Sequence, residues 1–568
     1  MPIRIDKFSG EVPAIIPRLL PGSSAQIAQN VRLEDGSLLP FRCGKLVHTF
    51  GSAMQTIYRH NGAWLGWPGV VKVAPAPIAD DRLYVTGDGV PKVITGGVSY
   101  PLKVPSPTAA LTVSQPSPVD PALSVTFIYT YTWVTFLGEE SEPAPLSEPV
   151  TSDPSKIVLL SGFQAAPTDR LFRYQNIYRS QTSVTGETNL FLIGYRLASN
   201  AVDFEDPTNG YYPVLDPLPS MDYNPPPDGL QGITALPNGI MAGFVGKRLY
   251  FSQPYVPHAW PEKYVLTTEY EIVGLGVFGQ SVAVLTTGHP YVVSGISPDS
   301  MSMERLKVNL ACVSARGIVD LGYAVAYPSA EGLVSISSGG AQLMTGGLFT
   351  REIWQALGPA TMIGGHSNGR YIATYTIGGE TGLLIVDTTG QQPFLIRASD
   401  TAGAMWNESG TGRLFLLQGG TKVFEWDSAE SPHTEMLWRS KLHVLPGHAN
   451  FGALLVEGVD TMTDAERSAN RTRWNLADLA ASVEVVGEPP FWLEPEGEGL
   501  LDPSPAPTPG FCAVIYADGR PVHVVTDLNR PARLPSGFLA LSWEVEIRGT
   551  MRVTAVSLAG SPAELTQP

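Results

Sequence analysis

Short stretches in which polar and apolar positions alternate recur along the chain. Four of them share one pattern: a turn or polar residue, then an arginine, then alternating aromatic and aliphatic side chains. They span residues 81–85, 247–251, 369–373 and 412–416. A period of two predicts β-strands rather than helices. Two more pairs of short alternating strands, each around a glycine-containing turn, lie at residues 282–293 and 324–336.

The spacing of the four arginines indicates a repeat. Arg413 follows Arg370 by about 43 residues, and Arg248 precedes Arg370 by about three steps of 41 residues, which matches one β-propeller blade. A four-stranded blade can bury both of its faces only by packing against neighbouring blades, so blades occur in series. We therefore predict a mainly β fold with a propeller of five or six blades, over residues 46–104 and 226–435. Unrelated β-sandwiches would also contain such strands, but the even spacing favours the propeller.

The interval between the first two arginines predicts an inserted domain. Arg82 and Arg248 are separated by about 120 residues more than one blade needs. Residues 105–225 open with the Pro-rich linker VPSPTAAL and continue with a strand that would place Tyr129, Tyr131 and Trp133 on one face. This strand and the acidic Gly-Glu-Glu-Ser turn after it resemble fibronectin type III modules. The resemblance implies a small sandwich that binds partners or acts as a spacer.

The pattern changes again after the last blade, so residues 436–568 are expected to form a separate C-terminal β domain. Thr463 and Glu466 have the spacing of a capping box, which predicts one helix over residues 464–480. Its apolar positions are sparse, so it should be exposed or packed at an interface. Residues 487–510 are acidic and rich in Pro and Gly, as in a loop that contacts a partner. Strands follow, with a hairpin turn at Asp518-Gly519.

Charge and composition restrict the possible functions. The chain has 53 acidic and 37 basic residues and a net charge of -16, which argues against binding nucleic acid by neutralising its phosphates. An acidic wall is nevertheless compatible with DNA that slides past it. The first residues lack the unbroken apolar segment of a signal peptide, and no apolar run reaches about 18 residues. We therefore expect a protein that is made soluble in a cytoplasm.

The search for catalytic and metal-binding patterns gives no candidate. The three cysteines are far apart, and none of the nine histidines lies in a catalytic or zinc-binding pattern. His443 and His448 are the closest histidine pair and are interpreted as loop or strand-end residues. The acidic clusters at residues 80–81, 139–140 and 494–498 fall in predicted turns or loops, where carboxylates are normally solvated. Phosphate-binding and calcium-binding loop motifs are missing. We predict no catalytic, cofactor-binding or metal-binding residue, no cofactor and no enzymatic activity.

The N-terminal segment, residues 1–45, carries a family resemblance. It contains Phe8-Ser9-Gly10 followed by Pro13, Pro17 and Leu20, then Ala-Gln-Ile-Ala-Gln-Asn-Val at residues 25–31 and Gly-Ser-Leu-Leu-Pro-Phe-Arg at residues 36–42. This order resembles the opening of the nozzle proteins (tail tubular protein B-like) of short-tailed bacteriophages. In that family, an arm with a Gly-Gly start continues through an Ala-x-x-x-Asn helix turn and enters the propeller by a Gly-x-Leu-x-Pro-x-Arg strand. Here Ser9 replaces one of the glycines.

Residues 291–357 show a second, similar order. A strand from Tyr291 to Gly295 is followed by a Met-Ser-Met stretch, by Cys-Val-Ser-Ala-Arg-Gly at residues 312–317, and by Ser-Ala-Glu-Gly-Leu at residues 329–333. Trp354 comes shortly afterwards. In nozzle-like propellers a tryptophan in this place closes the wedge between two blades.

The resemblance implies a structural virion protein of the phage tail, made in the host cytoplasm. Six copies would form a ring, the distal DNA conduit and gate used in genome ejection. This homohexamer would be joined to the head-to-tail adaptor ring and to tail fibres or spikes, and DNA would pass without sequence recognition. The inserted sandwich and the loop at 487–510 are the segments expected to contact fibres or neighbouring subunits. The alternatives are a tail-associated propeller lectin or depolymerase acting on bacterial surface polysaccharide, and a cellular scaffold propeller.

Overall fold

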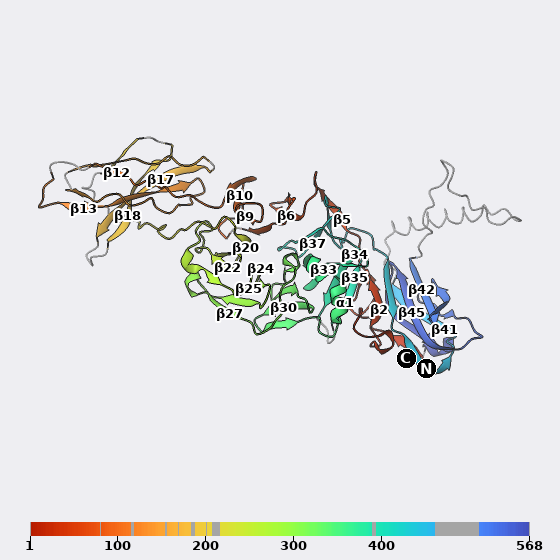
Figure 1. Ribbon diagram of the computed structural model, residues 1–568. Helices are drawn as coiled ribbons and strands as arrows, with labels where there is room; N and C mark the ends of the chain where they lie inside the picture. The colour runs from red at the N-terminus through yellow and green to blue at the C-terminus, as the bar shows by residue number, and fades with distance from the viewer. Residues whose placement is uncertain are drawn as a thin grey trace, which may run out of the picture. The chain divides into compact units, whose positions relative to one another are not determined.

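Alternating sequence stretches form strands along the described chain (Figure 1), and all of their pairings are antiparallel except that of β2 with β35. The computed structural model describes residues 2–566 except 76, 80, 115–118, 154–155, 169, 183–187, 200–201, 207–215, 389–392 and 460–509. The predicted helix at 464–480 and almost all of the loop at 487–510 therefore lie outside the described residues. The described chain divides into two compact units, residues 69–312 and residues 1–68 with 313–568.

The unit of residues 69–312 contains three four-stranded blades. The first strands of these blades, β8, β20 and β24, lie next to one another in that order, as the inner strands of a propeller do. The blades are formed by β8 (Lys72–Pro75), β9 (Arg82–Thr86), β10 (Lys92–Thr95) and β11 (Val98–Pro101); by β20 (Gln231–Ala235), β21 (Met241–Val245), β22 (Arg248–Phe251) and β23 (Leu266–Thr267); and by β24 (Ile272–Phe278), β25 (Ser281–Thr286), β26 (Tyr291–Ser294) and β27 (Ser302–Arg305).

The other unit contains three more blades, and its first strands β28, β32 and β36 are likewise neighbours. The N-terminal strand β5 completes the last blade by pairing with β38. The hairpin of β6 (Thr56–His60) and β7 (Ala63–Trp67) packs beside β36. The blades are formed by β28 (Val319–Asp320), β29 (Val325–Pro328), β30 (Leu333–Ser337) and β31 (Gly340–Leu343); by β32 (Gly364–Ser367), β33 (Arg370–Ile377), β34 (Glu380–Asp387) and β35 (Phe394–Ala398); and by β36 (Ala404–Asn407), β37 (Leu414–Gln418), β38 (Lys422–Glu425) and β5 (Lys45–Thr49).

The predicted fold class is confirmed: the protein is mainly β and of the β-propeller type, with six four-stranded blades in the described residues. One α-helix, α1 (Arg351–Ala356), occurs in this part of the chain. The single turns of 3-10 helix are η1 (Pro17–Leu19), η2 (Glu262–Tyr264), η3 (Pro298–Ser300), η4 (Ala315–Gly317), η5 (Pro359–Thr361) and η6 (Pro562–Thr566).

The inserted segment forms the predicted sandwich. Tyr129, Tyr131 and Trp133 of β14 enter its core together, next to Leu160 and Ile177. One three-stranded sheet has the order β12-β16-β19, the other β14-β17-β18, and β13 pairs with β15. The strands are β12 (Thr112–Val113), β13 (Val125–Phe127), β14 (Tyr129–Thr135), β15 (Val150–Ser152), β16 (Val158–Ser161), β17 (Phe172–Thr182), β18 (Thr188–Leu197) and β19 (Phe204–Asp206).

The C-terminal β domain is completed by N-terminal strands, which the sequence did not predict. β1 (Ile3–Ile5) pairs with β46, and β2 (Ala25–Gln29) pairs with both β35 and β39. The sheets have the orders β1-β46-β41-β44 and β2-β39-β45-β42-β43, with β40 beside β45. The strands are β39 (Met436–Ser440), β40 (His443–Ala449), β41 (Ala453–Val459), β42 (Phe511–Ala517), β43 (Arg520–Val525), β44 (Ala532–Arg533), β45 (Ala540–Gly549) and β46 (Arg552–Ala559).

One expectation for residues 1–45 is wrong. Residues 25–29 form strand β2 rather than the helix turn that the resemblance implied. The backbone of β2 is paired on both sides, and Ala25 and Ala28 are buried in the core of this unit. The entry strand near Pro40 is short: β4 (Leu39–Pro40) pairs with β3 (Val31–Arg32). The arm is therefore built into the fold at residues 3–5 and 25–29.

Candidate functional site

The acidic turn after β14 is buried rather than solvated, which corrects the interpretation of residues 139–140. The Glu139 side chain is 5% exposed and pairs with the guanidinium of Arg170, which is 1% exposed. Arg170 also donates to the carbonyl oxygens of Pro101, the last residue of strand β11, and of Leu102, which follows it. Burial lowers the pKa of Arg170 to about 10, so the group remains cationic at neutral pH. This ion pair fixes the sandwich to the blade that precedes it.

Glu140 stabilises the same turn through a separate set of hydrogen bonds. Its carboxylate accepts hydrogen bonds from the Tyr178 hydroxyl at 2.6 Å and the Thr132 hydroxyl at 2.5 Å. Its backbone oxygen accepts a hydrogen bond from Nε2 of His258 at 3.0 Å, in the loop after β22. Burial lowers the pKa of His258 to about 3, so this imidazole is neutral at pH 7. Asn224 adds a fourth contact to this turn, because its amide donates to Glu142 at 2.6 Å.

We call the residues Glu139, Glu140, Arg170 and His258 the mount. Each of these residues makes at least one ion pair or hydrogen bond within the same unit, while Glu139 Oε1, Arg170 Nε and His258 Nδ1 have no hydrogen-bond partner among the described residues. A buried charge is tolerated when it is paired and hydrogen-bonded in this way. The arrangement suits a rigid connection between the sandwich and the neighbouring blades.

The sandwich contains a second buried ion pair. Arg179 on β17 contacts Asp206 on β19 at 2.9 Å, and both side chains are nearly inaccessible. The Tyr129 hydroxyl donates to the same carboxylate at 2.8 Å, and burial raises the pKa of this tyrosine. Since β17 and β19 belong to different sheets, the pair ties the two layers together.

The N-terminal arm is attached to the blade of β32–β35 by Glu11. Its backbone exchanges two hydrogen bonds with Leu395, at 2.8 and 2.9 Å. Its carboxylate accepts from the backbone N–H of Ala28 at 3.0 Å and contacts Arg397 at 3.1 Å. Burial raises the pKa of Glu11 above its usual value. We call the contacts of Glu11 with Leu395, Ala28 and Arg397, together with the pairing of β2 with β35 and β39, the seam.

The remaining sequence candidates are not brought together. Asp81 is exposed and accepts a hydrogen bond from Thr95 at 3.0 Å, and residues 494–498 lie outside the described residues. His443 and His448 both lie on β40, and burial lowers the pKa of His443 to about 4. In the described part of the chain, no group of three His, Cys, Asp or Glu side chains is arranged to hold a metal ion. Nor does a described helix have the length and apolarity to cross a membrane.

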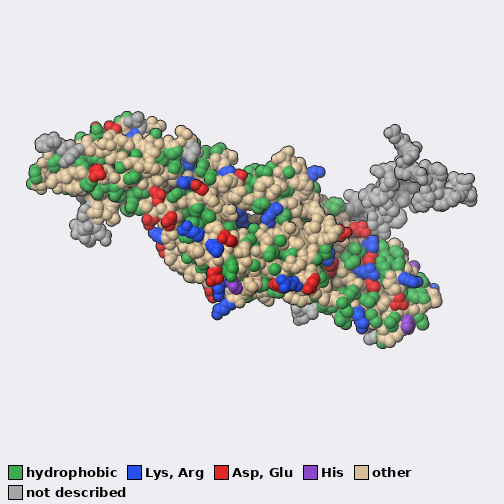
Figure 2. All heavy atoms as spheres, in the orientation of Figure 1, with side chains coloured by type: hydrophobic (Ala, Val, Ile, Leu, Met, Phe, Trp, Pro, Cys, Tyr) green, Lys and Arg blue, Asp and Glu red, His purple; other side chains and the backbone are tan. Residues whose placement is uncertain are grey.

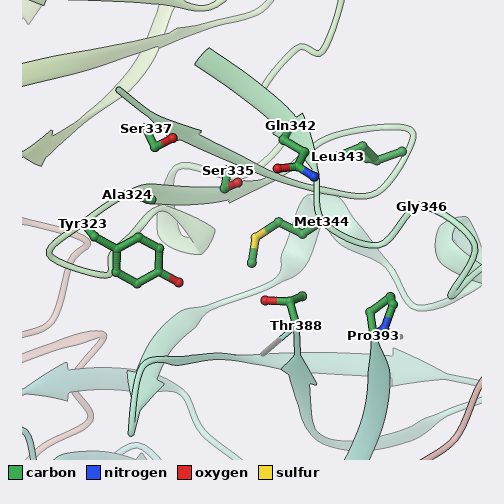
Figure 3. Close-up of a pocket in the computed structure, with 10 residues that line it drawn as sticks. All are labelled: Tyr323, Ala324, Ser335, Ser337, Gln342, Leu343, Met344, Gly346, Thr388 and Pro393. Carbon is green, nitrogen blue, oxygen red and sulfur yellow. The ribbon is translucent and has the colours of Figure 1, made fainter. Parts of the chain in front are cut away.

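A pocket of about 390 Å³ lies in the unit of residues 1–68 and 313–568 (Figure 3). It lies between the blade of β28–β31 and the ends of β34 and β35 in the next blade. None of its described lining residues is charged; they are Tyr323, Ala324, Ser335, Ser337, Gln342, Leu343, Met344, Gly346, Thr388 and Pro393. The sequence did not single out this site, although the Asp-Leu-Gly-Tyr turn at residues 320–323 marks the hairpin that presents Tyr323.

Acidic and basic side chains are intermingled on the face of the molecule that Figure 2 shows. The excess of negative charge therefore does not form one large acidic area on this visible face. Local attraction to phosphate or to a basic partner is correspondingly limited there.

Comparison with known proteins gives only distant structural likenesses. No family model and no curated protein matches the chain. The structure of BBS1N in complex with ARL6DN has a TM-score of 0.28 and 9% identity, over 70% of this chain and 98% of that one. The extracellular domain of the putative hybrid two-component system BT4673 from B. thetaiotaomicron has a TM-score of 0.29 and 7% identity, over 74% of this chain and 43% of that one. PorZ of Porphyromonas gingivalis has a TM-score of 0.24 and 9% identity, over 73% and 44%.

Proposed function

We propose that this chain is a structural subunit of a short phage tail, a nozzle of which six copies form the distal DNA conduit. It would be made in the host cytoplasm, reside in the tail of the virion, and serve in genome ejection. Its partners would be the head-to-tail adaptor ring, tail fibres or spikes, and translocating DNA that is not read by sequence. The proposal starts from the resemblance at residues 8–42 and 291–357.

The observation that carries the proposal is the seam. The segment with the N-terminal resemblance is the one that pairs with β35 of a blade and with β39 of the C-terminal domain. Backbone hydrogen bonds thus run without interruption from the blade into that domain. A conduit subunit that passes a movement from one end to the other needs such a stiff connection.

Two further features support this function. Trp354 on α1 is fully buried between blade residues such as Leu333 and Tyr371, and its indole N–H donates to the Ser329 carbonyl at 2.8 Å. The resemblance expects a tryptophan there to close a wedge. The mount would hold the sandwich as a rigid arm for a fibre or a neighbouring subunit, as spacer modules do.

The oligomeric state tests the proposal. In size-exclusion chromatography with light scattering we expect particles that contain six copies of the chain, either as a free hexamer of six times the monomer mass or in a complex with the adaptor protein of its own phage. A closed ring needs a head-to-tail interface, so intermediate masses should be rare. A chain that remains monomeric with and without that adaptor would contradict the nozzle assignment.

A further inference from the structure

The pocket described above occupies the outer end of the wedge between two blades. The inner part of this wedge is filled by large apolar side chains, including Leu333, Tyr371 and Leu384. Three of the side chains that line the pocket are small, namely Ala324, Ser335 and Ser337, whereas Tyr323, Leu343 and Met344 line its other parts. Protein interiors rarely leave such space unfilled. The opening is therefore a consequence of which residues the sequence places at these positions.

The strand register gathers the polar groups of the pocket on one face of the blade. Ser335 on β30 lies opposite Gln342 on β31 and opposite Ala326 on β29. Ser337, two residues further along β30, points to the same side. Within the described residues, the Ser335 hydroxyl and the Gln342 amide make no hydrogen bond to another protein group. Both are therefore available to a ligand.

An aromatic ring stands at the edge of this polar surface. Tyr323 is 64% exposed, and Figure 3 shows its ring and the Met344 side chain directed at the same space, with Thr388 and Pro393 beneath. The ring is presented by a tight turn in which the Leu321 amide donates to the Ala324 carbonyl at 2.8 Å. Gly322 has a φ of +83°, and its amide donates to the Asp320 carboxylate at 2.7 Å. The turn fixes the backbone that carries the ring before any ligand arrives.

The chemistry of the lining selects one ligand class. A charged ligand would lose hydration without meeting an opposite charge, because the described lining is uncharged. A wholly apolar ligand would cover the half-buried Ser335 hydroxyl without giving it a hydrogen-bond partner. A sugar ring offers an apolar face for the tyrosine and hydroxyl groups for the serine and glutamine. The volume of about 390 Å³ is at the lower end of the usual range for small-molecule sites.

We propose that this wedge pocket binds a neutral saccharide unit, with Tyr323 stacking on the ring and Ser335 and Gln342 bonding its hydroxyls. The inference goes beyond the proposed nozzle function and does not depend on it. It gives the chain a place to hold a neutral sugar at the outer edge of a blade. No covalent step is involved.

Saturation-transfer difference NMR on the full chain tests this site. The probes are the methyl glycosides of glucose, galactose, mannose and N-acetylglucosamine at millimolar concentration. We expect saturation transfer to the ring protons of at least one of them, with an affinity at least tenfold higher than that of methyl glucuronide. No transfer to any of the four, or equal affinity for the glucuronide, would overturn the proposal.

Substitutions locate the binding. Tyr323→Ala and Gln342→Ala should each weaken the affinity at least fivefold, because each removes one contact at the exposed rim. Tyr195→Ala is the matched control, since Tyr195 is also 64% exposed but lies on β18 of the sandwich. Unchanged thermal unfolding of the variants would show that they are folded. Binding that survives both rim substitutions, or that is lost equally in the control, would refute the assignment to this pocket.

Discussion

At the scale of single residues, breaking the buried ion pair of the mount should strongly destabilise its unit. Arg170→Met keeps an unbranched apolar stem of similar shape but removes the guanidinium, and it leaves the Glu139 carboxylate buried without its partner. Breaking a buried pair in this way costs about 3–5 kcal/mol. We expect a clearly lower unfolding temperature for the variant in differential scanning calorimetry.

A matched exposed pair provides the control for that substitution. Lys263 and Asp222 lie 2.8 Å apart, but both side chains are more than half exposed. Exposed pairs contribute little, about 0–1 kcal/mol. Lys263→Met should therefore leave the unfolding temperature nearly unchanged, and equal losses in the two variants would contradict the role of the mount.

His258 gives the mount a pH dependence. Its pKa is about 3 in the folded chain and about 6.5 when unfolded, so the unfolded chain takes up the proton first. The contribution of neutral His258 to the free energy of unfolding is fully present above pH 6.5. It declines as the pH falls from 6.5 toward 3, by at most about 1.4 kcal/mol per pH unit. His258→Gln keeps a donor for the Glu140 carbonyl but cannot titrate. Between pH 7 and 4, the stability of the wild type should therefore fall more steeply than that of the variant. Parallel curves would exclude this role.

The burial and pairing of the side chains in the mount could not be predicted from the sequence. Glu139 and Glu140 follow a strand and lie in a sequence that predicts a turn. Carboxylates in turns are normally solvated. Their burial depends on Arg170 and His258, which are distant in the sequence and come close only when the sandwich meets its neighbouring blades. By contrast, the core positions Tyr129, Tyr131 and Trp133 followed directly from the period of two.

At the scale of elements, strand β2 should hold the blade and the C-terminal domain of its unit together. Removing residues 1–30 deletes its hydrogen bonds to both β35 and β39. We expect faster hydrogen exchange in residues 394–398 and 436–440, because their amides lose a neighbouring strand. Residues 281–294 belong to the other unit and should exchange as before.

A point substitution tests the contribution of Glu11 separately from that of strand β2. Glu11→Gln keeps an oxygen to accept from the Ala28 amide but removes the charge that faces Arg397. It should accelerate exchange in the same segments, but less than the truncation. If the truncated chain exchanges like the wild type at residues 394–398, the seam does not have the role proposed for it.

The sequence predicted the blades better than the strands within them. Arg82, Arg370 and Arg413 begin or directly precede β9, β33 and β37, the second strand of each blade, whereas Arg248 begins β22, the third strand of its blade. The repeat was still recognisable because neighbouring strands in a blade have similar patterns. The error at residues 25–29 has another cause: the helix turn was implied by the family resemblance, but pairing with β35 and β39 decides the conformation of these residues.

At the scale of the whole molecule, the chain is a series of β modules whose connections are themselves structured. The sandwich is joined to blades by the mount, and a blade is joined to the C-terminal domain by the seam. The net charge of -16 would be repeated in every copy of an assembly, which would disfavour adhesion of DNA to it. The proposed conduit would require rigid joints and weak adhesion of DNA to its wall.

Electron microscopy of the assembly formed with the adaptor protein tests the nozzle proposal most directly. The proposal predicts a ring with six-fold symmetry, a central channel wide enough for duplex DNA, and one sandwich per subunit. Particles without rotational symmetry, or a ring whose centre is closed by the bodies of the subunits, would contradict it.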